Sequence, residues 1–221
     1  MKKHLLALGL VGCVSFAVAQ TPGSWLIQGG ITQISPSVTS GSLSAPSPSG
    51  TTVGVGSDNQ VTAQLTYVYN DQWSVAVPLG LGFKHKLYGT GAISNTGQIG
   101  TVTALPVTVF GQYRLGEANA KFRPYGMLGL SYVYFHDAQG SAALNGLNPI
   151  NPAGGSTGLK VDSKFAPSVG LGMFIRIDDR WFVDLSYAKT FLKTTTTLST
   201  GQTINTTLNP GTTTLGVGIR F

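Results

Sequence analysis

The sequence predicts an all-β protein, an eight-stranded antiparallel transmembrane β-barrel of the up-and-down type. Apolar and other residues alternate over segments of about 9 to 11 residues or more, the length that a tilted strand needs to cross a bilayer. Charged residues make up only 10% of the chain. No apolar run beyond the N-terminal segment approaches the roughly 18 residues of a membrane helix. A barrel surrounded by lipid accounts for these facts, because its strands alternate in polarity.

The N-terminal segment predicts export. Two lysines precede an apolar run over residues 5–18, and Ala17-Val18-Ala19 forms a small-x-small cleavage site. We therefore interpret residues 1–19 as a signal peptide and residues 20–221 as a barrel domain in the outer membrane of a diderm bacterium. The alternative is lipidation at Cys13, because the residues before it resemble a lipoprotein cleavage box. Cleavage after Ala19 would discard this cysteine, the only one in the chain.

Eight strand candidates follow in order along the chain. The clearest hairpin covers residues 164–190, where strict period two continues on both sides of a polar turn. The alternating segments are residues 25–36, 60–70, 73–83, 101–115, 121–136, 164–177, 181–197 and a last strand that ends at Phe221.

The connections between these strands alternate in length. Residues 37–57, 88–100 and 137–158 are rich in Gly, Ser, Thr, Asn or Pro and are predicted to be long mobile loops. The connections between them are short and polar. Outer-membrane barrels have short periplasmic turns and longer outer loops, so this pattern predicts which end of the barrel faces outward. Aromatic residues near both ends, among them Phe83 at the outer one, predict two interfacial girdles.

Several segments resemble the OmpW family of outer-membrane proteins, and they occur in the same order over essentially the whole mature chain. The segments are Asp71-Gln72-Trp73, Phe83-Lys84-His85-Lys86, Leu105-Pro106 with Gln112-Tyr113, residues 121–125 with 129–132, and Gly218-Ile219-Arg220-Phe221. The resemblance implies a narrow hydrophobic lumen that takes up small apolar solutes, with outer-membrane lipids around the barrel. It also implies that the barrel-insertion machinery reads Phe221. Pro78 and Ala188 depart from the family, because bulky groups narrow the lumen at comparable positions.

Charged residues at inward positions gather near the short turns. Eight strands close a barrel whose interior is just filled by side chains or holds one small ligand. We expect these residues to form a charged floor that closes the lumen, in which they meet one another and the amides of Gln64 and Gln112. The alternative is a set of arginines at a solvated rim. The charged floor consists of Arg114, Arg123, Arg176, Asp184 and Arg220.

Above this floor, the inward side chains include large apolar groups that either line a pocket for a hydrophobic guest or simply fill the barrel. These residues are Phe110, Met127, Phe135, Phe174, Phe182 and Leu192. Prolines inside strands remove ladder donors and weaken the wall, so we hypothesise that a guest leaves sideways into the membrane. The prolines are Pro78, Pro106, Pro124 and Pro167.

Other classes of function have little support in the sequence. Beyond the signal segment only His85 and His136 could act as an imidazole base. His85 lies between two lysines, and the adjacent His136 and Asp137 are expected to point to opposite faces of a strand. We expect no catalytic site, no cofactor, no metal site and no nucleic-acid partner. The remaining alternative to a channel is a structural barrel or a surface receptor without transport activity.

Overall fold

The computed structural model describes residues 22–147 and 157–221. The predicted signal peptide and Cys13 lie outside the described residues. Within the described part, no helix is long and apolar enough to span a membrane.

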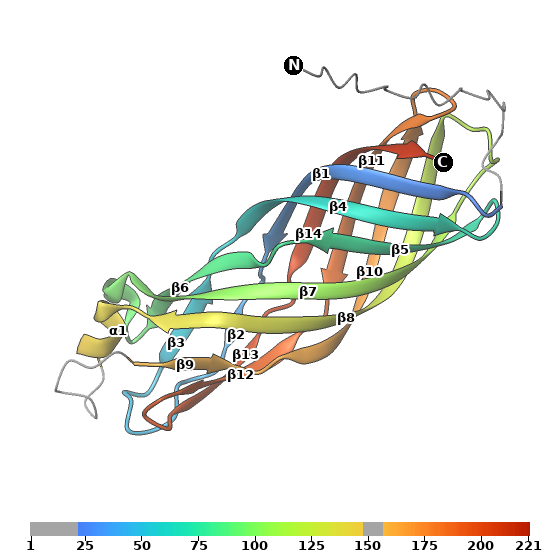
Figure 1. Ribbon diagram of the computed structural model, residues 1–221. Helices are drawn as coiled ribbons and strands as arrows, with labels where there is room; N and C mark the ends of the chain where they lie inside the picture. The colour runs from blue at the N-terminus through green and yellow to red at the C-terminus, as the bar shows by residue number, and fades with distance from the viewer. Residues whose placement is uncertain (1–21, 148–156) are drawn as a thin grey trace, which may run out of the picture.

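Eight strands close into an antiparallel barrel, which confirms the predicted fold (Figure 1). The ring closes where β1 pairs with β14, from Leu26 with Arg220 to Ser35 with Gly211. Neighbours in the ring are also neighbours in the sequence, as an up-and-down barrel requires. In ring order the strands are β1 (Trp25–Ser35), β4 (Asp58–Val68), β5 (Trp73–Gly80), β7 (Gln98–Arg114), β8 (Phe122–Gly140), β10 (Lys164–Arg176), β11 (Trp181–Thr190) and β14 (Gly211–Arg220).

Six further strands extend the wall at the long-loop end. β3 (Thr51–Val55) pairs with β6 (Phe83–Gly91), and β6 in turn pairs with β7. A second sheet has the order β2 (Thr39–Ser40), β13 (Thr203–Thr207), β12 (Lys193–Leu198) and β9 (Leu159–Val161). A 3-10 turn (Ser94–Thr96) and the short helix α1 (Ala142–Gly146) complete this end.

The prediction that residues 37–57 form one mobile loop was therefore wrong for β2 and β3. The segment Thr51–Val55 is rich in β-branched residues and supplies the partner that the edge of β6 would otherwise lack. Residues 88–100 and 137–158 were likewise predicted as loops, but β6 continues to Gly91, β7 begins at Gln98 and β8 continues to Gly140. The extended pairing of these strands makes the outer part of the wall longer than the sequence alone indicated.

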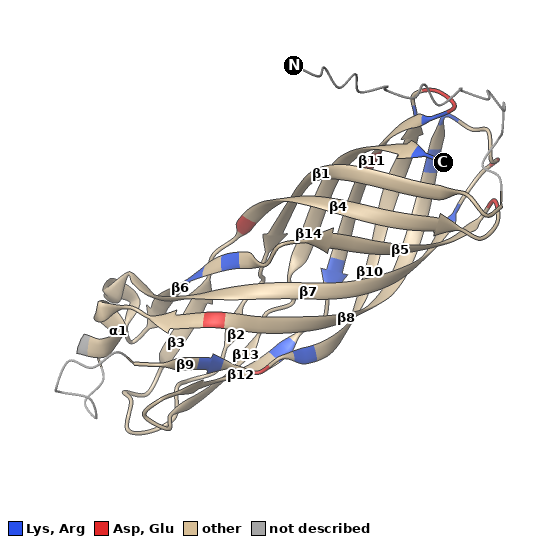
Figure 2. Ribbon diagram, in the orientation of Figure 1, with Lys and Arg blue, Asp and Glu red and all other residues tan. Residues whose placement is uncertain are grey.

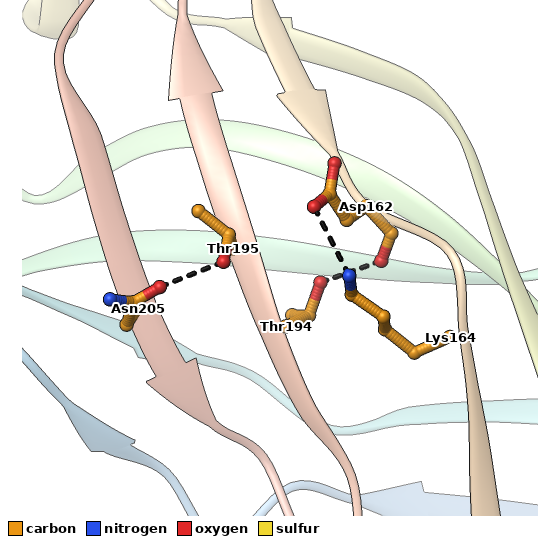
Figure 3. A network of polar contacts seen from close by, with 5 residues as sticks. All are labelled: Asp162, Lys164, Thr194, Thr195 and Asn205. Carbon is orange, nitrogen blue, oxygen red and sulfur yellow. Dashed lines mark hydrogen bonds and ion pairs between the residues drawn. The ribbon is translucent and has the colours of Figure 1, made fainter.

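A polar network fastens the second sheet to the barrel where β9 leads into β10 (Figure 3). The Thr194 hydroxyl donates to the carbonyl of Asp162 over 2.6 Å, and the Thr195 hydroxyl donates to Oδ1 of Asn205 over 2.7 Å. Lys164 and Asp162 form an ion pair of 3.4 Å, but both side chains are exposed. The Thr194 bond therefore contributes more to this junction than the ion pair does, while the Thr195 bond joins β12 to β13 within the second sheet.

The outside of the barrel carries an apolar band. Large apolar side chains such as Ile31, Leu128 and Phe165 are exposed there, while charged residues lie at the short-turn end and in a zone part-way along the wall, where the outer extension begins (Figure 2). Aromatic pairs mark the short-turn end, with ring centroids 4.9 Å apart for Trp25 and Tyr67 and 4.9 Å apart for Trp73 and Tyr113. An exposed apolar band with aromatic residues at its edge is typical of a barrel wall in contact with the lipid tails of a bilayer.

Candidate functional site

The lumen holds a cavity of about 250 Å³. One water molecule needs roughly 10–15 Å³ of such space, so the cavity has room for a small guest. Its walls come from inward residues of the barrel strands and of the outer extension. Of the six apolar residues predicted to line a pocket, Phe110, Met127, Phe135 and Leu192 lie on the cavity wall.

Phe174 and Phe182 lie in a layer of buried side chains at the short-turn side of the cavity. Their rings stack with centroids 4.5 Å apart, and the guanidinium carbon of Arg114 lies 5.4 Å from the centroid of Phe174. We call this the aromatic layer. It consists of Leu26, Val68, Ala76, Phe110, Tyr125, Met127, Phe174, Phe182 and Ala188. Because these residues pack together, the layer fills the barrel between the cavity and the short turns.

Three large side chains of the aromatic layer lie over a glycine of the neighbouring strand. Phe110 is paired with Gly129, Tyr125 with Gly172 and Phe182 with Gly218. A Cβ atom at Gly172 would lie 2.3 Å from the Tyr125 ring, and one at Gly218 would lie 2.4 Å from the Phe182 ring. Only glycine leaves room for these rings to cross a narrow interior.

Two of the residues predicted to form a charged floor contact the aromatic layer, Arg114 at the Phe174 ring and Asp184 at the Tyr125 hydroxyl. Arg114, Arg123 and Asp184 are buried, whereas Arg176 and Arg220 are partly exposed. One terminal nitrogen of Arg123 donates to the carbonyl of Asp71 over 2.7 Å and to that of Gly116 over 3.4 Å. These carbonyls belong to two different short turns, so Arg123 ties the turns together from inside the barrel.

Asp184 is held by a tyrosine. The hydroxyl of Tyr125 lies 3.0 Å from each carboxylate oxygen of Asp184, and both residues are buried. Gln112, which was expected to meet the charged residues, accepts a hydrogen bond from the Ser74 hydroxyl over 3.0 Å. The partner of Asp184 is therefore a tyrosine that the sequence had not indicated.

We expect replacement of Tyr125 by phenylalanine to lower the free energy of unfolding by about 2 kcal/mol, because it removes a buried hydrogen bond to a carboxylate. Urea unfolding of the refolded barrel in lipid vesicles, followed by tryptophan fluorescence, measures this change. Tyr113→Phe is the matched control, since that ring lies on the outer surface. Equal stability of the two variants would contradict a supporting role for the Tyr125 hydroxyl.

Hydroxyl groups connect the inner wall in two chains that the sequence alone did not reveal. Thr108, Ser131, Ser168 and Thr190 join β7, β8, β10 and β11 through successive oxygen distances of 2.8, 2.9 and 2.8 Å. Thr32 lies 2.7 Å from Thr62 and 2.9 Å from Thr214, which joins β14, β1 and β4. The signal was present as Ser and Thr at inward positions, but the pairing of these residues depends on register.

The wall between β5 and β7 is interrupted. β5 pairs with β7 from Trp73 to Ala76, and ladder pairing with β7 resumes at Phe83 of β6, opposite Ala104. Residues 77–82 thus face residues 105–109 without ladder pairs, and we call this region the seam. The six residues 77–82 lie opposite only five residues of β7. This extra residue exchanges the inner and outer side-chain positions of β6 relative to those of β5. Phe83, predicted as an outer girdle residue, is consequently buried in the lumen.

Pro106 removes a hydrogen-bond donor from the seam. The N–H of Arg114 donates toward β5, to Gln72, over 2.7 Å, and that of Leu115 donates toward β8, to Pro124, over 2.8 Å. N–H groups alternate between the two sides of a strand, so the even-numbered residues of β7 direct theirs toward β5. Residue 106 would do so too, but proline has no N–H.

Pro78 acts on the opposite side of the seam. The carbonyl of Trp73 accepts from the N–H of Tyr69 on the β4 side over 3.0 Å. Because backbone groups alternate between the two sides of a strand, the even-numbered residues of β5 direct their N–H and C=O groups toward β7, and Pro78 has no N–H to offer there. The seam therefore lacks a donor from each of its two strands. By contrast, Pro167 lies opposite Leu130 and Pro124 lies opposite Met173 in a continuous ladder.

The cavity reaches the outer surface at the seam. Its lining includes Leu79 and Leu81, whose side chains are 51% and 79% exposed on the outside of the barrel. Leu105 and Pro106 line it from the β7 side. An apolar rim therefore connects the lumen to the apolar band.

One sequence expectation about a possible base was wrong. His136 and Asp137 do meet, with 2.8 Å between Nδ1 and Oδ2, because Asp137 has a φ of 48° and leaves regular strand geometry. Both side chains are substantially exposed. Among the residues that the structure describes, no group of three His, Cys, Asp or Glu side chains could hold a metal ion.

Comparisons with known proteins give consistent similarities. The model of the OmpW family matches residues 21–221. Outer membrane protein W of Vibrio cholerae is 28% identical over 227 aligned residues, which cover 100% of each chain. The dibenzothiophene metabolism operon protein PahQ of Pseudomonas aeruginosa is 26% identical over 167 residues, covering 74% of this chain and 72% of that protein. The crystal structure of OprG from Pseudomonas aeruginosa aligns with a TM-score of 0.80 and 22% identity, over 91% of this chain and 97% of that chain.

Proposed function

The chain belongs to the OmpW family of outer-membrane proteins, and we propose that its barrel takes up small apolar molecules through the outer end of the lumen and releases them sideways into the membrane. The observation that carries this proposal is the seam. The cavity is blocked toward the short turns by the aromatic layer and the charged floor, whereas its side wall lacks ladder pairs and is apolar. An apolar guest meets a lower barrier at the seam than at the floor.

The nature of the relatives supports an apolar guest. The name of PahQ links that protein to the metabolism of dibenzothiophene, an apolar aromatic compound. The cavity of this chain is lined mainly by carbon, with side chains such as Phe83, Val133 and Leu192. A guest of this kind gains free energy when it leaves water for such a lining, and again when it enters the bilayer.

Uptake by intact cells tests the proposal. The protein is expressed in a diderm host that lacks its own family member, and a naphthylamine probe that fluoresces in phospholipid is added outside. We expect the fluorescence to rise faster with the protein than without it. An unchanged rate, with the barrel folded and present in the outer membrane, would favour a structural barrel or a surface receptor instead.

Restoring the missing donors should strengthen the seam. We expect the double variant Pro78→Ala with Pro106→Ala to slow uptake of the probe several-fold, because both strands regain an N–H group toward each other. Pro167→Ala is the matched control, since that proline lies outside the seam in a continuous ladder. Equal uptake by the double variant and the control would show that guests do not leave between β5 and β7.

A further inference from the structure

His85 places a single imidazole on the wall of the cavity. It is 4% exposed and lines the cavity together with Phe83, Leu87 and Val55. Its neighbours Lys84 and Lys86 point outward and are exposed, so this part of β6 lies beyond the apolar band. The extra residue in the seam turns the odd-numbered side chains of β6 inward. Phe83, His85 and Leu87 are therefore all buried.

The hydrogen bond of His85 determines which ring nitrogen carries the proton. Nδ1 lies 2.7 Å from the carbonyl oxygen of Gly56, between β3 and β4. A carbonyl only accepts, so Nδ1 carries the hydrogen and donates it. In the neutral ring, Nε2 is then an acceptor.

The second nitrogen remains available to a guest. No hydrogen bond from the described residues reaches Nε2 of His85. Burial lowers the pKa of the imidazole, against the opposing effects of the Gly56 bond and Asp58, which favours the neutral ring. The charge of Asp58 is already engaged, since its Oδ2 accepts from the backbone N–H of Lys84 over 2.8 Å and from Gln60 over 3.0 Å.

We propose that Nε2 of His85 is the polar anchor of a guest subsite, which selects molecules with a compact apolar body and one hydroxyl group, such as phenols and small alcohols. The hydroxyl donates to Nε2, and the apolar body packs against the surrounding lining. This inference rests on the proposed function and names the class of guest. A buried acceptor that only the hydroxylated molecule can satisfy discriminates against its apolar analogue.

The route from this anchor to the seam offers a second hydroxyl contact. Thr108 lies on β7 inside the seam, lines the cavity and forms one end of the four-hydroxyl chain. A hydroxyl can both donate and accept, so Thr108 can exchange its bond to Ser131 for one to a passing guest. A singly hydroxylated molecule thus has a polar partner at each end of the path.

Binding of a matched pair of probes tests the subsite. The full chain is reconstituted in lipid nanodiscs, and the affinities of 1-naphthol and 1-methylnaphthalene are measured by fluorescence. The two probes have similar size and differ in the hydroxyl group. We expect His85→Asn to lower the affinity ratio of 1-naphthol to 1-methylnaphthalene by about five-fold, because Asn can keep the bond to Gly56 but offers no acceptor at the Nε2 position.

Two further variants serve as comparisons. His85→Gln places an amide oxygen near the Nε2 position and should recover part of the ratio, while Lys84→Gln, on the outer face, should leave it as in the unaltered protein. An unchanged ratio in His85→Asn would overturn the subsite while the channel proposal stands. If neither probe binds more than to empty nanodiscs, the proposed function and the subsite both fail.

A spectroscopic measurement tests whether the guest hydroxyl reaches Nε2 of His85, even if His85→Asn does not fold. In the unaltered protein with ¹⁵N-labelled histidine, the Nε2 resonance of His85 should shift on addition of 1-naphthol and not on addition of 1-methylnaphthalene. A His136→Gln sample assigns the two histidine signals of the barrel. Identical responses to both probes would overturn the proposal.

Discussion

Replacing Thr212 by tryptophan is expected to reduce uptake of the naphthylamine probe at least about ten-fold, to nearly the rate of cells without the protein, because a narrow eight-stranded lumen has no second path around a bulky group. Thr212 faces the cavity from β14 and is only partly buried, so a larger side chain at this position projects into open space. Among the described contacts its side chain makes no hydrogen bond that the substitution would break.

The neighbouring residue supplies the control. Thr213 lies on the same strand, faces outward and is exposed, so Thr213→Trp adds the same bulk on the lipid side. Both variants should remain folded, which a heat-induced mobility shift on SDS gels checks. If Thr212→Trp and Thr213→Trp take up the probe equally fast, the lumen is not the route, and the proposed function is wrong.

Replacing Arg123 by alanine is expected to lower the free energy of unfolding by about 3 kcal/mol, because two carbonyls lose a charged hydrogen-bond donor and a large buried side chain is truncated. Arg123 is 0% exposed, and its guanidinium supplies donors to carbonyls of the two turns that flank β5 and β7. Without it, these carbonyls lose a buried partner and the side chain leaves a cavity beside the aromatic layer.

Urea unfolding in lipid vesicles measures this loss, with Arg180→Ala as the control. Arg180 is exposed in the turn between β10 and β11, so its removal should change the stability by less than about 0.5 kcal/mol. A similar small change for Arg123→Ala would mean that the charged floor contributes little to holding the short turns together. It would also favour the alternative of arginines at a solvated rim.

Much of the barrel could be predicted from local patterns. Alternation over residues 164–190 identified β10 and β11 as a hairpin, and the alternation of short and long connections identified the two ends. Inward and outward faces were correct wherever a strand is continuous, as for Phe110 and Met127 on the cavity wall. These predictions depend on a property of the single strand, that successive side chains point to opposite sides.

The seam shows where this reasoning fails. Counting by two from Trp73 assigned Phe83 to the outside, and His85 would have followed it. The structure turns both inward, because one strand carries an extra residue between two paired regions. The hydroxyl chains have the same origin, since Thr108 and Ser131 meet only in the register that the barrel adopts. Lys84 and Lys86 on either side of His85 were a hint of its inward position, since lysines favour the water-exposed face.

By itself, the sequence determined that eight amphipathic strands with alternating connections form a membrane barrel, because side-chain alternation and turn composition are local properties of the chain. Only the tertiary structure decided where the wall is left unpaired, which side chains fill the lumen and which nitrogen of His85 faces the cavity. These features depend on how distant strands align when the barrel closes, and a shift of one residue in that alignment exchanges the inner and outer faces.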